Sequence, residues 1–433
     1  MKEFIVCSLL FLLVSCNNND SLFVSLTSNK TQIKFQNNLT STTDLNILNY
    51  LYYYNGAGVA AADFNNDGLA DLYFTGNQTA DKLYLNTGGL QFKDITKQAL
   101  INNSTPWTTG VTTVDINNDG FLDIYICKIG AHNSIKGNNL LYINEGPDIN
   151  GIPRFKEAAS FYGLDIASFA TQASFFDYDK DGDLDLFLMN HSLYPNSNYG
   201  KGALRLEVDQ KSGDKLLENK QGNFIDVSSE AGIFQGKIGY GLGVSIGDVT
   251  NDGYPDIYVG NDFFENDYLY LNQKNKTFKE VISNDKTTLG HTSHFSMGNA
   301  ISDLNNDTHM DIISLDMLPE NLKTYKTSGL EFPYQTYQYY LKNGYAPQFM
   351  QNTLHYNNGN GTFSETAYLS GIAATEWSWS PIIGDYDNDG FKDLYITNGI
   401  LGATNDMDYI NFISNEAIQK QLATEKSQRN LEL

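Results

Sequence analysis

The chain has few cysteines and few prolines, three and nine in 433 residues. Cys7 lies within a leading apolar segment and Cys16 at its end, so Cys127 is the single cysteine of the remaining chain. An intramolecular disulfide is therefore excluded for the folded domain, whose stability must come from other interactions. The low proline content, together with 13% aromatic residues, is typical of an all-β repeat architecture.

Basic residues are also scarce, since 28 Lys and Arg stand against 51 Asp and Glu, for a net charge of −23. This balance disfavours nucleic-acid binding. After the leading segment there is no apolar run of about twenty residues, so no membrane span is expected. The sequence also lacks a glycine-rich phosphate loop, a G-x-S-x-G nucleophile elbow and an H-E-x-x-H zinc helix, so we assign no catalytic residue and do not expect an enzyme.

The first 16 residues resemble a bacterial lipoprotein signal peptide. Lys2 precedes an apolar stretch over residues 4–13, and Leu13-Val14-Ser15-Cys16 resembles a lipobox. We expect Cys16 to carry the lipid and residues 17–21 to form a polar tether, which predicts an outer membrane lipoprotein of the cell envelope. The face of the membrane stays open. The alternatives are an ordinary secretory signal and a cytosolic protein that starts with an apolar helix.

A short acidic motif occurs six times, and its richest copy starts at Asp177. Oxygen-bearing side chains stand at relative positions 1, 3 and 5, glycine at 6 and Asp at 9. The glycine permits a sharp turn that gathers the oxygens around one point, which is the ligand pattern of Ca²⁺. Unlike an EF-hand, the motif lacks Glu at position 12, and apolar alternating strands flank it. The alternative is an Asn/Asp/Gly turn without metal.

Up to six Ca²⁺ ions are therefore expected. The candidate ligands are Asp63, Asn65, Asp67, Asp71, Asp115, Asn117, Asp119, Asp123, Asp177, Asp179, Asp181, Asp185, Asp248, Thr250, Asp252, Asp256, Asp303, Asn305, Asp307, Asp311, Asp385, Asp387, Asp389 and Asp393. The third and sixth copies have four carboxylates each and should bind most tightly. Thr250 weakens the fourth copy, and Thr308 replaces the turn glycine of the fifth, which we expect to be weakest or empty.

The copies start 52 to 82 residues apart, and a spacing near fifty indicates propeller blades. A strand of small residues precedes each loop, and an apolar strand follows it. A third strand has a Leu-Tyr-x-Asn character, as at residues 83–86, 141–144, 269–272 and 354–357, and a fourth begins at Phe92, Phe224, Phe278 or Phe363. Four strands would form one blade.

The loops and strands, with segments 50–56, 291–298 and 377–379, resemble the FG-GAP/VCBS repeat family, whose calcium-loop blades form integrin alpha-chain propellers. Large exported lipoproteins of Bacteroidota associated with ASPIC/UnbV modules look most similar, although no such module is present here. The resemblance implies an all-β propeller over residues 22–402 and does not identify a ligand.

Six blades are favoured, with seven blades or an incomplete ring as alternatives. The sixth copy ends after its second strand, and residues 22–26 and 33–35 have the pattern of a third and a fourth strand. We expect these to pair with the last copy and close the ring. The rival is a truncated final blade. Residues 403–433 are expected to form a helical tail.

Three features depart from the repeat. An insertion at residues 318–350 combines helical stretches with Tyr325, Phe332, Tyr334, Tyr337, Tyr339, Tyr340, Tyr345 and Phe349. It forms either a cap that holds a sugar or peptide against aromatic faces or a packed cover over a blade. Trp377 and Trp379 share one strand face and belong to the core or, with Trp107, to a carbohydrate surface. His291 and His294 pack a loop or share a transition metal.

Two functions remain open. The first is a lipid-anchored, calcium-dependent binding or adhesion propeller for a protein or glycan. The second is a carbohydrate-active enzyme or an accessory subunit of glycan uptake, because scattered carboxylates on a propeller can support catalysis without a local motif. The membrane is contacted only through the N-terminal lipid.

Overall fold

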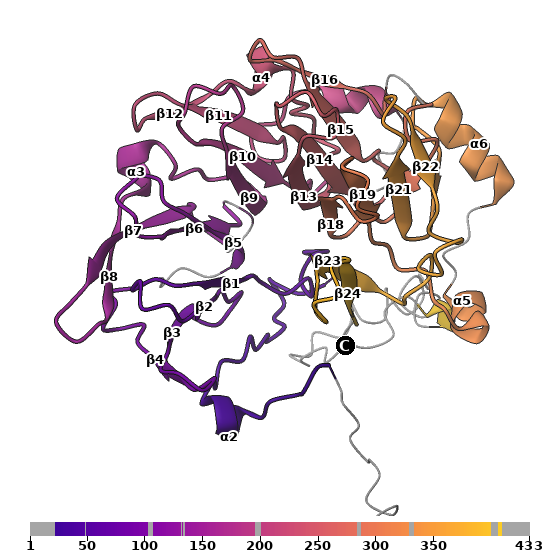
Figure 1. Cartoon of the computed structure of the whole chain (residues 1–433). Coiled ribbons are helices and arrows are strands. Elements are labelled where there is room, and N and C mark those ends of the chain that lie inside the picture. Colours follow the sequence, from indigo (N-terminus) through magenta and orange to yellow (C-terminus); the bar gives the residue numbers. More distant parts are fainter. Residues whose placement is uncertain are drawn as a thin grey trace, which may run out of the picture.

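The computed structural model describes residues 22–47, 49–102, 107–130, 132, 135–194, 201–283, 287–328, 333–399 and 406–408. Antiparallel sheets of consecutive strands dominate this part of the chain and are arranged around a common centre (Figure 1). The signal segment, the tether, Cys16 and nearly all of the expected helical tail lie outside the described residues. Among the helices that are described, none is long and apolar enough to cross a bilayer.

Five sheets have four strands each, as the repeat pattern predicts. The first contains β1 (Val59–Ala62), β2 (Asp71–Phe74), β3 (Lys82–Asn86) and β4 (Phe92–Asp94). The second contains β5 (Thr108–Val114), β6 (Asp123–Lys128), β7 (Leu140–Pro147) and β8 (Pro153–Glu157). The third contains β9 (Ala170–Phe176), β10 (Asp185–Asn190), β11 (Lys215–Asn219) and β12 (Phe224–Asp226).

The fourth sheet contains β13 (Gly241–Gly247), β14 (Asp256–Asn261), β15 (Tyr268–Asn272) and β16 (Phe278–Glu280). The fifth contains β18 (Asn299–Ser302), β19 (Asp311–Ser314), β21 (Thr353–Asn357) and β22 (Phe363–Glu365). A sixth sheet contains β23 (Ser378–Gly384) and β24 (Asp393–Asn398), and β17 (Thr292–Ser293) pairs in parallel with β20 (Gln348–Phe349). The helices are α2 (Ser28–Thr31), α3 (Ala159–Tyr162), η2 (Gly202–Leu206), α4 (Ser228–Ala231), α5 (Leu322–Thr327) and α6 (Tyr334–Lys342).

The core lies between neighbouring sheets. One cluster packs Tyr73 and Leu83 of the first sheet against Ile124 and Tyr142 of the second. Four further clusters pack the second sheet against the third, the third against the fourth, the fourth against the fifth, and the fifth against the sixth. The first strands of consecutive sheets also contact one another from β1 through to β23. Every residue of β6, β10 and β14 is buried, because a sheet stands on both sides of each strand. The arrangement is propeller-like.

The expected third and fourth strands at residues 22–26 and 33–35 do not form, so that prediction is wrong. The polar stretch between them winds into α2 and ends at Gln32, whose φ of 63° redirects the chain. Phe23 nevertheless packs against Tyr395 of β24, with ring centroids 5.2 Å apart, and Phe35 stacks on Phe74 of β2 at 5.1 Å. The segment therefore contacts both the last and the first sheet through side chains.

Candidate metal loops and an aromatic pocket

Each acidic loop connects the first strand of a sheet to the second, and all six share one turn. The fourth residue has a φ between 55° and 62°, and the sixth has a φ between 74° and 96°. Asp63 illustrates the folding of the turn, because its two carboxylate oxygens accept the backbone N–H groups of Asp67 and Gly68 at 3.1 and 2.7 Å. The first Asp thus organises the cup that the sequence predicts.

The ninth residue connects the loop to its sheet. Asp71 Oδ2 accepts the N–H of Phe64 at 3.1 Å, and its Oδ1 accepts the N–H of Asn86 on β3 at 2.7 Å. Burial raises the pKa of Asp71 to about 6, against the opposing effect of these two amides. The same cause raises the pKa of the equivalent Asp123 to about 6 and those of Asp185 and Asp256 to about 7. These carboxylates therefore hold the loop to its sheet through hydrogen bonds, in addition to being candidate metal ligands.

Two loops bring three carboxylates together. Ligand atoms of Asp177, Asp179 and Asp185 lie within 4.8 Å of one another, as do those of Asp385, Asp387 and Asp393. These are the third and sixth copies, for which the tightest binding is expected. In the other loops the candidate ligands share the turn without such a carboxylate cluster among the described residues.

The loop oxygens fit a hard cation. Oδ1 of Asp177, Oδ1 of Asp183 and Oδ1 of Asn65 are buried, and no hydrogen-bond donor contacts them. A buried acceptor without a donor is costly, and an ion coordinated by it removes that cost. Carboxylate and amide oxygens are the ligands that Ca²⁺ prefers.

A lysine from the next sheet reaches the third loop, which the sequence did not predict. Lys276 Nζ lies 2.5 Å from Asp179 Oδ2 and 2.6 Å from Glu218 Oε1. Hydrogen bonds from its ammonium to Asp179 and Glu218 raise the pKa of Lys276. The loop with the most carboxylates thus has a counter-ion within the protein, which a bound cation would have to tolerate or displace.

The fifth loop keeps its turn without glycine. Thr308 adopts a φ of 74°, and its N–H contacts Asp303 Oδ2 at 2.9 Å, as the glycine does in the other loops. The left-handed conformation strains a β-branched residue. Threonine in place of glycine at this position therefore raises the energy of the backbone, while the geometry of the fifth loop is the same as in the other loops.

His291, His294 and Trp107 pack against neighbouring side chains. His294 is buried, and its Nδ1 lies 2.9 Å from Gln348 Oε1, while His291 packs edge-on against Phe349 at 4.9 Å. Neither belongs to a metal-ligating cluster of the described residues. Trp107 is 1% exposed and packs against Tyr50, so it does not form a carbohydrate surface.

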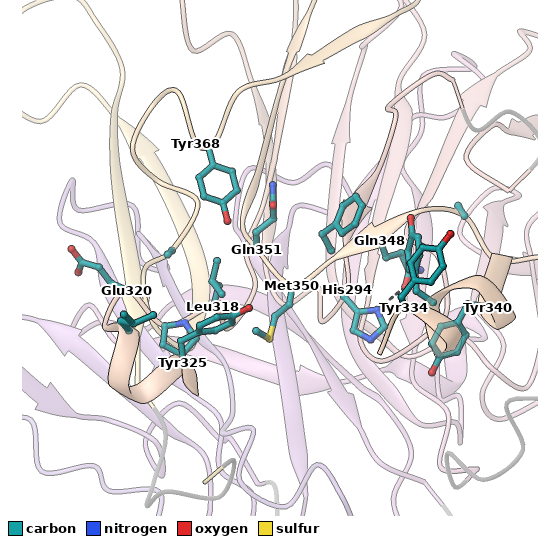
Figure 2. Close-up of a pocket in the computed structure, with 16 residues that line it drawn as sticks. His294, Leu318, Glu320, Tyr325, Tyr334, Tyr340, Gln348, Met350, Gln351 and Tyr368 are labelled. Carbon is teal, nitrogen blue, oxygen red and sulfur yellow. Dashed lines mark hydrogen bonds between the residues drawn. The ribbon is translucent and has the colours of Figure 1, made fainter. Parts of the chain in front are cut away.

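The insertion lines much of an open pocket of about 760 Å³, within the usual range for ligand sites. Figure 2 shows Tyr325 and Leu318 on one side, Tyr334 and Tyr340 on the other, and Met350 and His294 between them. Tyr337 and Phe349 also line it and stack with ring centroids 5.6 Å apart. The helical insertion is confirmed, as α5 and α6, while Phe332 lies outside the described residues.

The polar groups of the pocket are mainly amides and phenols. Gln348 and Gln351 contribute amides, and Glu320 is the one acidic side chain among the described lining residues, which include no Lys or Arg. Tyr368, from the loop after β22, is 67% exposed at the opening. No sequence pattern points to Tyr368, which only the fold brings to the insertion, whereas Gln351 directly follows the insertion in the chain.

The fold and the loops define a class of repeat protein, and comparison with known families agrees. Residues 63–126, 248–314 and 345–396 match the family model described as "FG-GAP-like repeat". The chain thus contains FG-GAP-like repeats, as the resemblance implied, and the first two matches start at the first Asp of a loop. The narrower relation to lipoproteins of Bacteroidota stays a prediction.

Cartilage acidic protein 1 of Mus musculus is 26% identical over 280 residues, which cover 59% of this chain and 39% of that protein. Cartilage acidic protein 1 of Homo sapiens is 33% identical over 136 residues, covering 31% and 20%. The chain therefore spans at most about two fifths of the length of these curated relatives. The FG-GAP-like repeats suggest a binding or adhesion-type module.

Solved structures give weaker likenesses. The V. cholerae biofilm matrix protein Bap1 matches with a TM-score of 0.33 and 12% identity, over 71% of this chain and 38% of that chain. A rhamnogalacturonan lyase of Bacillus licheniformis matches with a TM-score of 0.31 and 9% identity, over 80% and 74%. Both scores are too low to establish a shared fold.

Proposed function

We propose that the protein is an exported, lipid-anchored, calcium-binding propeller that captures a glycan in the aromatic pocket. The pocket carries this proposal, because it is built where the chain departs from the repeat. Aromatic rings there are partly exposed beside neutral amides, and sugar rings bind to such surfaces through their apolar faces and hydroxyl groups. With a single carboxylate and no Lys or Arg among the described lining residues, the pocket favours a neutral glycan.

The rims of the pocket are accessible. Tyr334 is 75% exposed and Phe349 is 45% exposed, whereas a ring that only covers a blade would be buried. Tyr345, by contrast, is 3% exposed and packs against Tyr340, so part of the insertion fills the core. The insertion thus combines a packed base with an open aromatic surface.

Calcium is assigned a structural role in this proposal. The cups lie in the turns between first and second strands, and none of their candidate ligands lines the pocket. Up to six ions would hold the turns rigid and offset part of the −23 charge. The lipid at Cys16 would keep the module at the cell envelope.

A glycan array tests the pocket. Wild-type protein in calcium should bind neutral glycans, and the Tyr334→Ala and Tyr368→Ala variants should lose about tenfold in affinity, the equivalent of about 1.4 kcal/mol. Tyr339→Ala is the matched control, because Tyr339 is 55% exposed on the same helix and does not line the pocket. Equal losses in all three variants, or binding of peptides in place of glycans, would contradict the assignment. Turnover of a bound glycan would support the alternative of a carbohydrate-active enzyme.

A further inference from the structure

A second cavity, of about 270 Å³, lies beside the aromatic pocket of the insertion. Four of its lining residues are aromatic, namely Tyr194, Tyr240, Phe264 and Tyr345. The two cavities share no described lining residue. Phe264 stacks on Tyr340, which lines the larger pocket, with ring centroids 4.8 Å apart. A stacked pair of rings thus stands between the two cavities, and the smaller one is a separate site.

The smaller cavity has a buried carboxylate in its lining, that of Glu265. Arg205 Nε donates to Glu265 Oε1 at 2.6 Å, and the Glu265 side chain is 0% exposed. Oε2 of the same carboxylate is buried and has no hydrogen-bond partner. Burial raises the pKa of Glu265 in spite of the opposing effect of Arg205. Because a buried acceptor without a donor is costly, a ligand that donates to Oε2 would gain free energy.

The cationic side chain of the lining does not meet this need. Lys237 lines the cavity, but its Nζ lies 2.6 Å from Glu207 Oε2, and both side chains are partly exposed, at 35% and 56%. Its ammonium is therefore held at the surface by another carboxylate. The sequence between Tyr194 and Lys201 contains no Lys or Arg that could take its place.

The remaining lining offers ring faces and apolar surface. The hydroxyl of Tyr194 already donates to Asp209 Oδ2 at 2.8 Å, and that of Tyr240 donates to the carbonyl of Tyr194 at 3.3 Å. These two tyrosines therefore present aromatic rings to a ligand, and a cation is attracted to the face of such a ring. Leu204 and Ile238 add aliphatic surface.

We propose that this cavity binds a small primary amine in its ammonium form. The ammonium donates to Glu265 Oε2 and lies against the tyrosine rings, while the hydrocarbon part packs on Leu204 and Ile238. The Glu265 carboxylate then has one cation at each oxygen, Arg205 at Oε1 and the ligand at Oε2.

The size and the charge of the protein suit such a ligand. A volume of about 270 Å³ is just below the range of drug-sized sites, so the cavity suits a molecule smaller than a drug. A net charge of −23 attracts cations and disfavours anions. A neutral alcohol lacks the charge, and a quaternary ammonium has no N–H to donate to the carboxylate. The proposal is independent of the glycan pocket.

Phenethylamine provides the probe, and isothermal titration calorimetry on the whole protein measures its binding. We expect saturable binding of one molecule per chain. Phenethyl alcohol, hydrocinnamate and phenethyltrimethylammonium have a similar shape and should each bind at least tenfold more weakly. This series uses only the wild-type protein, so it does not depend on the folding of a variant.

Variants place the amine in the smaller cavity. Glu265→Gln should weaken amine binding at least tenfold, and Tyr194→Ala should weaken it threefold to tenfold through the lost ring face. Tyr339→Ala is the matched control, because Tyr339 is 55% exposed and lines neither cavity. Tyr334→Ala, which alters the glycan pocket, should also leave amine binding unchanged.

Four results would overturn the proposal. The amine does not bind, or the alcohol binds as tightly. The trimethylammonium compound binds as tightly, which would mean that no N–H reaches Glu265. Tyr334→Ala weakens amine binding as much as Tyr194→Ala does, which would place the amine in the glycan pocket. The amine binds only after removal of residues 409–433, which would mean that the chain itself fills the cavity.

Discussion

Thr308 shows how a single residue can keep the geometry of a repeat at an energetic cost. It holds the left-handed position that glycine occupies in the other five loops, with a φ of 74°. From the sequence, the missing glycine predicts that the fifth metal site is the weakest or empty. The turn nevertheless forms, because Asp303 still accepts both the Asp307 and the Thr308 N–H. The local sequence indicates that Thr308 strains the turn. Whether the turn forms in spite of this strain depends on tertiary contacts, which the local sequence does not show.

Replacing Thr308 by glycine should therefore stabilise the protein. Relief of the left-handed conformation is expected to raise the free energy of unfolding by about 1 kcal/mol, measured by denaturant titration in chelator. Gly68→Thr is the reciprocal control and should lower it by a similar amount, since a Cβ at Gly68 meets no atom within 4 Å. A destabilising Thr308→Gly substitution would contradict this explanation.

His191 should make stability depend on pH. It is 1% exposed between Tyr50 and Tyr52, and burial lowers its pKa to about 3. In the unfolded chain the His191 imidazole takes up a proton below about pH 6.5, whereas the buried imidazole stays neutral. The contribution of His191 to the free energy of unfolding is therefore fully present above pH 6.5 and is lost as the pH falls toward 3.

The test is to measure the free energy of unfolding of the wild type and of His191→Gln at pH 7, 6 and 5. The advantage of the wild type should shrink below pH 6.5 by up to about 1.4 kcal/mol per pH unit. Buried carboxyls such as Asp267, whose pKa burial raises to about 7, act in the opposite sense and cancel in this difference. A difference that does not vary with pH would refute the assignment.

At the scale of elements, the sequence predicts what depends on local pattern. Strands β3, β7, β15 and β21 lie at the Leu-Tyr-x-Asn segments, and β4, β12, β16 and β22 begin at the predicted phenylalanines. The prediction of strands at residues 22–26 and 33–35 was wrong because apolar residues in such a segment can also contact neighbouring sheets through their side chains alone. The contacts between sheets, such as Lys276 with Asp179, could not be predicted, since they depend on distances across the fold.

The insertion is held in place by a charge pair that no local pattern reveals. Arg205 Nε donates to Glu265 Oε1 at 2.6 Å, and its Nη1 donates to the carbonyl of Gly344, just after α6, at 3.2 Å. Its guanidinium also lies over the ring of Tyr345, 5.6 Å from the centroid. Both partners of the pair are almost fully buried. Arg205 thus connects the chain just after α6 to the loops of the third and fourth sheets.

Arg205→Ala should destabilise the protein by about 3–5 kcal/mol, because it leaves the Glu265 carboxylate buried without its partner. Thermal and denaturant unfolding would measure the loss, and glycan affinity should fall with it. The double variant Arg205→Met/Glu265→Leu should recover most of the stability. Lys237→Ala, which breaks an exposed pair with Glu207, serves as the control and should have little effect. A mild effect of Arg205→Ala would show that the pair does not anchor the insertion.

For the whole molecule, the central question is how a domain without disulfides and with a net charge of −23 remains folded. Six cups of hard oxygen ligands offer one answer. Extracellular calcium modules bind with affinities near millimolar, so at about ten times the Kd each ion would add roughly 1.4 kcal/mol and six would add on the order of 8 kcal/mol. That is comparable to the whole stability of a typical domain, about 5–15 kcal/mol.

Chelation should therefore lower the melting temperature by many degrees. Melting curves in excess calcium and in excess EDTA would measure this shift, and magnesium in place of calcium controls for ionic strength. An identical melt in both conditions would mean that the loops are metal-free turns.

The most direct measurement is a calcium titration followed by native mass spectrometry, which counts bound ions. We expect up to six calcium ions per chain, with the loops at Asp177 and Asp385 filling first and the loop at Asp303 last. Asp177→Asn and Asp385→Asn should each remove one early-binding ion and leave the others. A spectrum that gains no stoichiometric calcium at millimolar concentration would contradict the account.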